Sequence, residues 1–136
     1  MRTFLLAATL CFSALPATAQ RLPAGVTPTH YTLWFAPDLE KETFRGRETI
    51  AVTLAAPATS ITLHAAEITF GEVTVTDAGG TQPARVSLDG TAETATFTVP
   101  RPVSKGPATI QVAFTGILND KLRGFYRSTF VDDAGD

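Results

Sequence analysis

The chain has 136 residues, of which 44% are hydrophobic and 18% are charged. This apolar fraction excludes a collagen-like, low-complexity or strongly charged disordered chain, because it can bury enough surface to offset the loss of chain entropy. The 11 Lys and Arg residues are balanced by 13 Asp and Glu residues, so the formal net charge is −2. No basic stripe is available for non-specific nucleic-acid binding. The length accommodates one domain.

The N-terminus has the three parts of an export signal. Arg2 supplies the positive charge, residues 4–15 form an apolar core, and Ala17-Thr18-Ala19 has the small residues of a cleavage site. The apolar run is shorter than the roughly 20 residues that a membrane-spanning helix needs. We therefore expect residues 1–19 to be a signal peptide that is removed, with an uncleaved membrane anchor as the alternative. The mature chain would then begin at Gln20, be periplasmic or extracellular, and have no membrane span.

Removal of the signal would leave few options for sulfur chemistry. The single cysteine, Cys11, lies inside the expected signal. Arg2 is the one charged residue of the signal, so its removal changes the net charge from −2 to −3. Residues 20–136 would therefore contain no disulfide, thiolate nucleophile or cysteine-based metal site.

Apolar side chains in residues 20–136 recur with a period of two, which is typical of half-buried strands. The chain also contains 22 Thr but only 3 Lys, a bias toward β-branched residues and away from helix formers. Val73 and Val75 have the opposite parity to Ile68 and Phe70, so a β-bulge is expected at Gly71. The alternating segments are 31–35, 50–54, 61–63, 68–70, 73–75, 86–88, 95–99 and 110–114.

Turn residues separate these segments, and no long amphipathic helix is indicated. About eight short strands at this spacing predict an all-β fold, an antiparallel β-sandwich over residues 20–136. Thr129-Phe130-Val131 is expected to form a further strand, and its position just before Asp136 suggests the start of a longer protein. The expected turns are Pro37-Asp38, Ala56-Pro57, 77–80, Asp89-Gly90, 100–107 and Gly116.

A search for catalytic or metal-binding residues gives no candidate site. His30 and His64 are far apart in the sequence and lack the H-E-x-x-H spacing of zinc hydrolases, so structural or partly exposed roles are expected. No serine lies in a G-x-S-x-G elbow, and Gly79-Gly80 lacks the lysine of a phosphate loop. The carboxylates at Glu40, Glu42 and Glu48 lie in a segment of mixed charge that also contains basic residues, which favours a solvated hairpin face over paired acid–base chemistry.

The aromatic residues divide between a core role and one exposed position. Trp34 falls on the opposite strand face from Tyr31 and Phe35, so it is expected to pack against another domain or to bind a ligand such as a sugar. Strand parity assigns five phenylalanines to the core, namely Phe35, Phe44, Phe70, Phe97 and Phe114.

The most distinctive motifs lie near the two ends of residues 20–136. A G-x-L-N-D turn at residues 116–120 precedes GFYRS at 124–128, and residues 21–33 read RLPAGVTPTHYTL. Three shorter motifs lie between them: PDL at 37–39, FRG at 44–46 and ITLHA at 61–65. In this order, the motifs resemble the N-terminal region of the M1 family of zinc aminopeptidases. Phe130 departs from the pattern, since the family usually has tyrosine there.

The resemblance implies a saddle-like β-sandwich that packs against a thermolysin-like catalytic domain of the same polypeptide, and a domain truncated at its C-terminal end. In such a scaffold, Gly46 would relieve crowding between strands, and Arg127 would pair with a carboxylate of a neighbouring element. Family members remove N-terminal residues from peptides with zinc held by H-E-x-x-H and a downstream glutamate, and none of these motifs occurs here. We therefore assign no catalytic, substrate-binding or metal-binding residue and no cofactor to this chain, and expect zinc and peptide substrates only in the parent protein.

The sequence leaves two other functions open. The chain can be a stand-alone secreted β-sandwich that binds sugar or protein, or it can belong to an M1-like scaffold that has lost catalysis.

Overall fold

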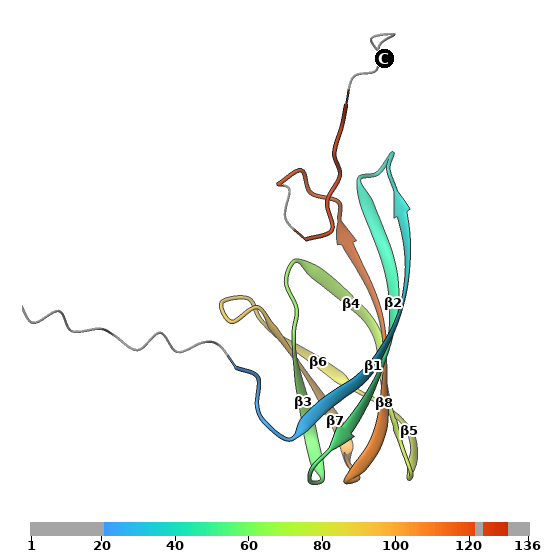
Figure 1. Ribbon diagram of the computed structural model, residues 1–136, viewed down its shortest axis with the longest axis vertical. Helices are drawn as coiled ribbons and strands as arrows, with labels where there is room; N and C mark the ends of the chain where they lie inside the picture. Colours follow the sequence, from blue (N-terminus) through green and yellow to red (C-terminus); the bar gives the residue numbers. More distant parts are fainter. Residues whose placement is uncertain (1–20, 122–123, 131–136) are drawn as a thin grey trace, which may run out of the picture.

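The computed structural model describes residues 21–121 and 124–130, which form two packed antiparallel sheets (Figure 1). The expected signal peptide lies outside these residues. The part of the chain that the structure describes contains no helix, and hence none long and apolar enough to cross a membrane. The strands are β1 (Val26–Asp38), β2 (Thr43–Leu54), β3 (Ala58–His64), β4 (Ile68–Asp77), β5 (Gly80–Pro83), β6 (Arg85–Asp89), β7 (Thr94–Val103) and β8 (Gly106–Ile117).

The two sheets differ in size. The larger sheet has five strands in the order β1-β2-β8-β4-β5, and the smaller has three in the order β3-β7-β6. The pairing of β2 with β8 runs without a register shift from Thr43 opposite Ile117 to Leu54 opposite Gly106. These two strands therefore form the unbroken centre of the larger sheet, with β1 added on one side and β4 and β5 on the other.

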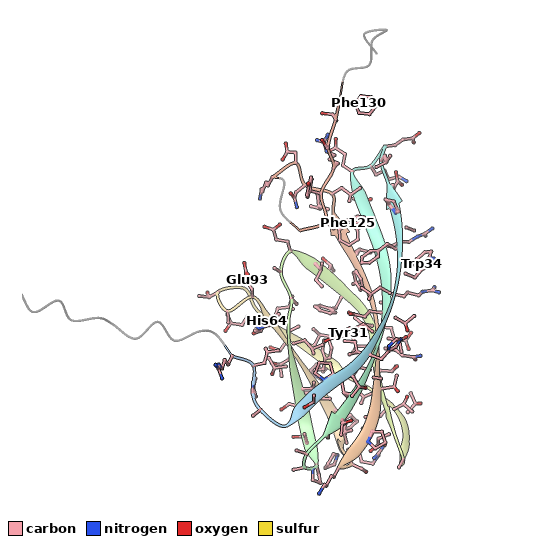
Figure 2. The ribbon with its side chains drawn as sticks, viewed as in Figure 1. Tyr31, Trp34, His64, Glu93, Phe125 and Phe130 are labelled. Atoms are coloured by element: carbon pink, nitrogen blue, oxygen red, sulfur yellow. The ribbon has the colours of Figure 1, made fainter. Side chains whose placement is uncertain are left out.

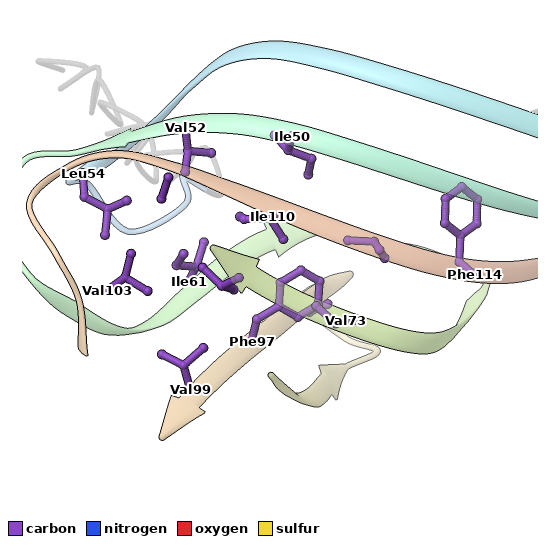
Figure 3. Close-up of a cluster of buried hydrophobic side chains, with 14 of the residues drawn as sticks. Ile50, Val52, Leu54, Ile61, Val73, Phe97, Val99, Val103, Ile110 and Phe114 are labelled. Atoms are coloured by element: carbon purple, nitrogen blue, oxygen red, sulfur yellow. The ribbon is translucent and has the colours of Figure 1, made fainter. Parts of the chain in front are cut away.

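The core lies between the inner faces of the two sheets (Figure 3). Ile110 of the larger sheet and Phe97 of the smaller sheet are both fully buried. Alternate residues along β2 and β8 point into this layer, as the period-two pattern predicts. The other labelled core residues in Figure 3 are Ile50, Val52, Leu54, Ile61, Val73, Val99, Val103 and Phe114.

The predicted antiparallel β-sandwich is confirmed, and so is the bulge in β4. The register of β4 against β8 shifts between Phe70 and Val73, which brings Val73 and Val75 back to the buried face. Parity alone located this irregularity, because an unbroken strand would have placed these two valines in solvent.

Several predicted turns are wrong, because turn-forming residues occur inside strands. Residues 100–103 continue β7, so the turn before β8 contains only Ser104 and Lys105. Gly116 lies within β8, and Pro37-Asp38 ends β1 rather than forming the turn. Pro37 is tolerated because β1 is an edge strand, where a missing N–H need not break a ladder hydrogen bond.

The strand expected at residues 129–131 is also not confirmed. Thr129 and Phe130 are not in a strand, and the Phe130 side chain is 86% exposed. Val131 lies outside the described residues. A strand needs a neighbouring strand to pair with, and none of the described strands pairs with Thr129 or Phe130.

At two positions of the β2–β8 pair, a phenylalanine on one strand faces a glycine on the other. Phe44 lies opposite Gly116, and Gly46 lies opposite Phe114. A methyl group at either glycine would overlap the ring of the facing phenylalanine. Each ring therefore occupies the space left by a missing side chain on the partner strand, which confirms that Gly46 relieves crowding.

A polar cluster joins the two sheets at the opposite end of the sandwich. The carboxylate of Asp77 is 1% exposed and accepts hydrogen bonds from Arg101 Nη2 at 2.8 Å and from the backbone N–H of Ser104 at 2.7 Å. Gln82 adds two bonds to the backbone of Arg101, donating from Nε2 to its carbonyl at 2.8 Å and accepting its N–H at 3.0 Å. These contacts tie β4 and β5 of the larger sheet to β7 of the smaller sheet.

The guanidinium of Arg101 and the backbone N–H of Ser104 hold the pKa of Asp77 well below its usual value of 3.8. A carboxyl whose pKa is lower in the folded than in the unfolded chain stabilises the fold when ionised. This stabilisation is present above about pH 4 and is lost as the pH falls through the native-state pKa.

Substitution of either glycine that faces a phenylalanine tests the interstrand packing. We expect Gly46→Ala or Gly116→Ala to lower the free energy of unfolding by about 1–3 kcal/mol, because the new methyl group must displace a packed ring. Urea unfolding followed by intrinsic fluorescence measures this difference. Gly71→Ala is the control, since an added Cβ there meets its nearest atom, the Ala113 carbonyl oxygen, at 3.5 Å. Equal stability losses for all three variants would contradict the explanation.

A second substitution tests the polar cluster. Asp77→Asn removes the charge that faces Arg101, so the variant should unfold at a lower temperature than the wild type at pH 7, and the difference should shrink below about pH 4. Asp89→Asn is the matched control, because Asp89 accepts hydrogen bonds from the backbone N–H groups of Thr91 at 3.0 Å and Ala92 at 2.9 Å and has no ion-pair partner among the described residues. Calorimetry from pH 3 to pH 7 provides the comparison; a pH-independent difference for Asp77→Asn would rule out the linkage.

Candidate functional site

The inner face of the larger sheet is covered only in part. β1, β2 and β8 have 13, 12 and 12 residues, whereas β3 and β6 in the smaller sheet have 7 and 5. The upper ends of the long strands extend beyond the smaller sheet (Figure 1). The inner-face side chains at this end of the sheet are here named the open face; Phe44 and Phe114 among them are buried beneath neighbouring rings. The open face comprises Tyr31, Leu33, Phe35, Phe44, Glu48, Phe114 and, from the segment after β8, Phe125.

The open face carries large exposed apolar side chains. Tyr31, Leu33 and Phe35 alternate along β1, lie on the inner side of the sheet, and are 47%, 50% and 42% exposed. Phe35 was predicted to be a core residue, and this assignment is wrong because no strand of the smaller sheet covers it. Parity identified the correct face of β1, but it carries no information on whether another layer lies above that face.

A cluster of four phenylalanine rings occupies one end of the open face. The Phe44 and Phe114 rings are 6.3 Å apart, and Phe35 lies 6.1 Å from the first and 5.8 Å from the second. Phe125 completes the cluster, with ring centroids 5.3 Å from Phe35 and 5.0 Å from Phe44. The tilted and edge-on orientations are those that aromatic quadrupoles favour. Phe125 therefore anchors the segment after β8 to the sheet.

Backbone contacts hold this segment in place. The Leu118 N–H donates to the Glu42 carbonyl at 2.8 Å, and the Arg127 N–H donates to the Asn119 carbonyl at 2.9 Å. Arg127 Nη2 lies 3.1 Å from Glu42 Oε1, which confirms the expected pairing of Arg127 with a carboxylate of a neighbouring element. Beside the segment, a cavity of about 440 Å³ is lined by Phe35, Phe44, Phe114, Phe125 and residues between β3 and β4.

Glu48 is the one charged side chain on the open face. It lies on the inner side of β2, directly between Leu33 of β1 and Val112 of β8. Its side chain is half-buried, and this burial raises the pKa of its carboxyl group. The expectation that Glu48 belongs to a solvated hairpin face is therefore wrong, whereas Glu40 and Glu42 are exposed as expected. The mixed charge of the segment misled the assignment, because strand parity gives Glu48 the same face as Ile50.

The outer face of the larger sheet has a different chemistry. Trp34 is 51% exposed and points away from Phe125, as parity predicts (Figure 2). The Arg47 guanidinium carbon lies 5.8 Å from the Trp34 ring centroid, a cation–π distance. Arg47 thus partners one face of the indole ring.

The described residues do not form a metal site. Both histidines are exposed; His30 lies on β1 of the larger sheet, whereas His64 ends β3 of the smaller sheet. Within residues 21–121 and 124–130, no group of three His, Cys, Asp or Glu side chains is placed to hold an ion. These residues therefore do not fit the zinc that the family resemblance implies, and we derive no chemical step through a metal in this chain.

Comparison with known proteins identifies the relatives of this fold. Residues 27–136 match the sequence profile of the Peptidase M1 N-terminal domain. The chain is 37% identical over 114 residues to aminopeptidase 2 of Candida albicans, which covers 83% of the chain and 12% of that relative. It is 31% identical over 118 residues to the puromycin-sensitive aminopeptidase of Caenorhabditis elegans, covering 85% of the chain and 12% of the relative.

The human endoplasmic reticulum aminopeptidase 1 is 29% identical over 121 residues, covering 85% of the chain and 13% of the relative. The matched region is thus about an eighth of the length of these curated relatives. The profile match nevertheless extends over most of the chain, through all eight strands except the first residue of β1. The chain therefore belongs to the M1 peptidase family, as its N-terminal domain.

Proposed function

We propose that this chain is the non-catalytic N-terminal domain of an exported, zinc-dependent M1 aminopeptidase that removes N-terminal residues from peptides. The observation that carries the proposal is the match of residues 27–136 to the M1 N-terminal domain, together with relatives named aminopeptidases. The catalytic domain of the same polypeptide would supply the zinc ligands and the general base. This chain would supply a rigid support for that domain.

The geometry favours a structural role, in which this chain supports the catalytic domain. The described residues form a well-packed sandwich at one end and leave an uncovered aromatic face at the other. Exposed apolar surface of this kind commonly marks an interaction site.

The activity of the parent protein can be measured directly. We expect the product of the complete reading frame to hydrolyse an L-aminoacyl-4-nitroanilide, to lose this activity on chelation and to regain it with zinc, whereas residues 20–136 alone should have no activity and bind no stoichiometric zinc. Replacing the glutamate of a downstream H-E-x-x-H by glutamine should lower kcat about 10²–10⁴-fold, because that glutamate acts as the base. A zinc-free full-length protein without hydrolytic activity would instead favour an inactive M1-like scaffold.

Export can be tested independently. The mature protein recovered from the periplasm or the medium should begin at Gln20, as read by mass spectrometry of the intact N-terminal peptide. Ala17→Arg together with Ala19→Arg should block processing, since the cleavage site requires small residues. An exported product that begins at Met1 would contradict cleavage.

A further inference from the structure

Two exposed arginines occupy neighbouring positions on the outer face of the larger sheet. Arg45 and Arg47 project from β2 on this face, and neither guanidinium forms an ion pair or a hydrogen bond with another described residue. The carboxylates that border the face are Asp38, which pairs with Lys41 at 2.7 Å, and Glu72, in the β4 bulge two strands away from β2. The other outward residues of β2 and β8 between them are uncharged, namely Thr43, Thr49, Ala51, Thr53, Thr109, Gln111, Ala113 and Thr115.

A hollow in the surface lies beside these arginines. It has a volume of about 560 Å³. Ala113 of β8 faces Arg47 on one side and the β4 bulge on the other, and a Cβ added at Gly71 in this bulge would lie 3.6 Å from the Ala113 Cβ. These two small residues leave the space over the middle of the sheet open. The hollow is here named the outer groove, and it is lined by Trp34, Arg45, Arg47, Thr69, Gly71, Ala113 and Thr115.

The wall of the outer groove on the β1 side is aromatic. Trp34 lies opposite Arg47 in the β1–β2 register, is 51% exposed and points out from the sandwich (Figure 2). The Arg47 guanidinium carbon lies 5.8 Å from the indole centroid, so a cation–π contact holds the two side chains together. The exposed part of the indole therefore offers an apolar surface directly beside a positive charge.

An occupant of the outer groove has to match an indole, two guanidiniums and the hydroxyl groups of Thr69 and Thr115. The C–H face of a pyranose ring packs on an exposed indole, while the hydroxyl groups at its rim bond to neighbouring polar groups. A guanidinium matches a planar carboxylate, to which it donates two parallel hydrogen bonds. A pyranose that carries a carboxylate, which is a hexuronate, combines these features in one molecule.

Other partners match fewer of these groups. A nucleic acid has a negative charge at every phosphate, and two cations on a chain with a net charge of −2 are too few to neutralise it. A second copy of this chain that met the first through the same face would bring arginines against arginines. An acidic peptide pairs with the arginines but brings no flat C–H face bordered by hydroxyl groups, and it is therefore the comparison ligand in the experiment.

We propose that the outer groove is a binding site for acidic saccharides, in which the carboxylate of a hexuronate pairs with Arg45 and Arg47 and the sugar ring packs on Trp34. The inference goes beyond the proposed function, because it involves neither zinc nor peptide hydrolysis. An exported enzyme with this site would be retained on acidic polysaccharide and would hydrolyse peptides there.

Calorimetric titration of the full-length protein tests the class of ligand. The probes are tetragalacturonate and tetramannuronate, with cellotetraose as the neutral saccharide and tetraglutamate as the acidic peptide, in about 50 mM salt, where ion pairs are little screened. We expect at least one uronate to bind about tenfold or more tightly than both comparison ligands, because only a uronate pairs with the arginines and covers the indole. Absence of uronate binding, or equal binding of either comparison ligand, would overturn the proposal.

Substitutions in the full-length protein test the location of the site. Trp34→Ala and Arg47→Gln should each weaken uronate binding about tenfold or more. Arg47→Lys should give an intermediate affinity, because it keeps the charge but loses the two parallel hydrogen bonds. Arg85→Gln is the matched control, since Arg85 is an exposed arginine on β6 of the smaller sheet, outside the outer groove.

The midpoint of thermal unfolding shows whether each variant is folded, and Arg47→Gln, which changes one exposed side chain, provides the test if Trp34→Ala unfolds. Equal weakening by Arg85→Gln would show that overall charge binds the saccharide and would overturn the assignment to the groove. A folded Arg47→Gln protein that binds uronate as tightly as the wild type would do the same.

Discussion

The uninterrupted pairing of β2 with β8 is the contact on which the rest of the domain depends. Twelve residues of each strand pair in register, with β1 added beside β2 and with β4 and β5 added on the β8 side. One half of the pair contributes Ile50, Val52 and Ile110 to the core. The other half carries the two facing phenylalanine–glycine pairs and the open face. The same two strands therefore serve both the stability of the sandwich and its exposed surface.

The two halves of this strand pair are stabilised in different ways. Near the β7–β8 turn, a second sheet covers the apolar side chains, and Asp77, Gln82 and Arg101 fasten the two sheets together. At the other end there is no second sheet, so the aromatic rings cover one another and Phe125 folds back over them. Without a disulfide among residues 20–136, stability must come from this burial and these polar contacts.

The distribution of charge separates the two faces of the larger sheet. On the outer face, Arg47 is exposed and lies beside Trp34, so both side chains retain contact with water. On the inner face, Glu48 is placed among apolar side chains, where water solvates it less well. These two adjacent residues have opposite charges and opposite environments because successive side chains of a strand point to opposite faces.

Much of this protein could be derived from its sequence, because strand patterns are local. The period of two established the fold class, the inward residues of β2, β7 and β8, the bulge in β4 and the outward direction of Trp34. Family motifs supplied the relationship to M1 peptidases, and they correctly indicated an interstrand role for Gly46 and a carboxylate partner for Arg127. Each of these features depends on residues close in sequence or on a pattern that recurs among relatives.

Tertiary structure decided which of the inward faces is covered. Parity treats Phe35 and Phe97 alike, yet the first is 42% exposed and the second is fully buried. The difference arises because the smaller sheet is too short to reach Phe35, and the extent of one sheet over another is a long-range property that no local pattern contains. The same reason hid the environment of Glu48, whose neighbours on β1 and β8 lie far away in the sequence and meet it only in the assembled sheet.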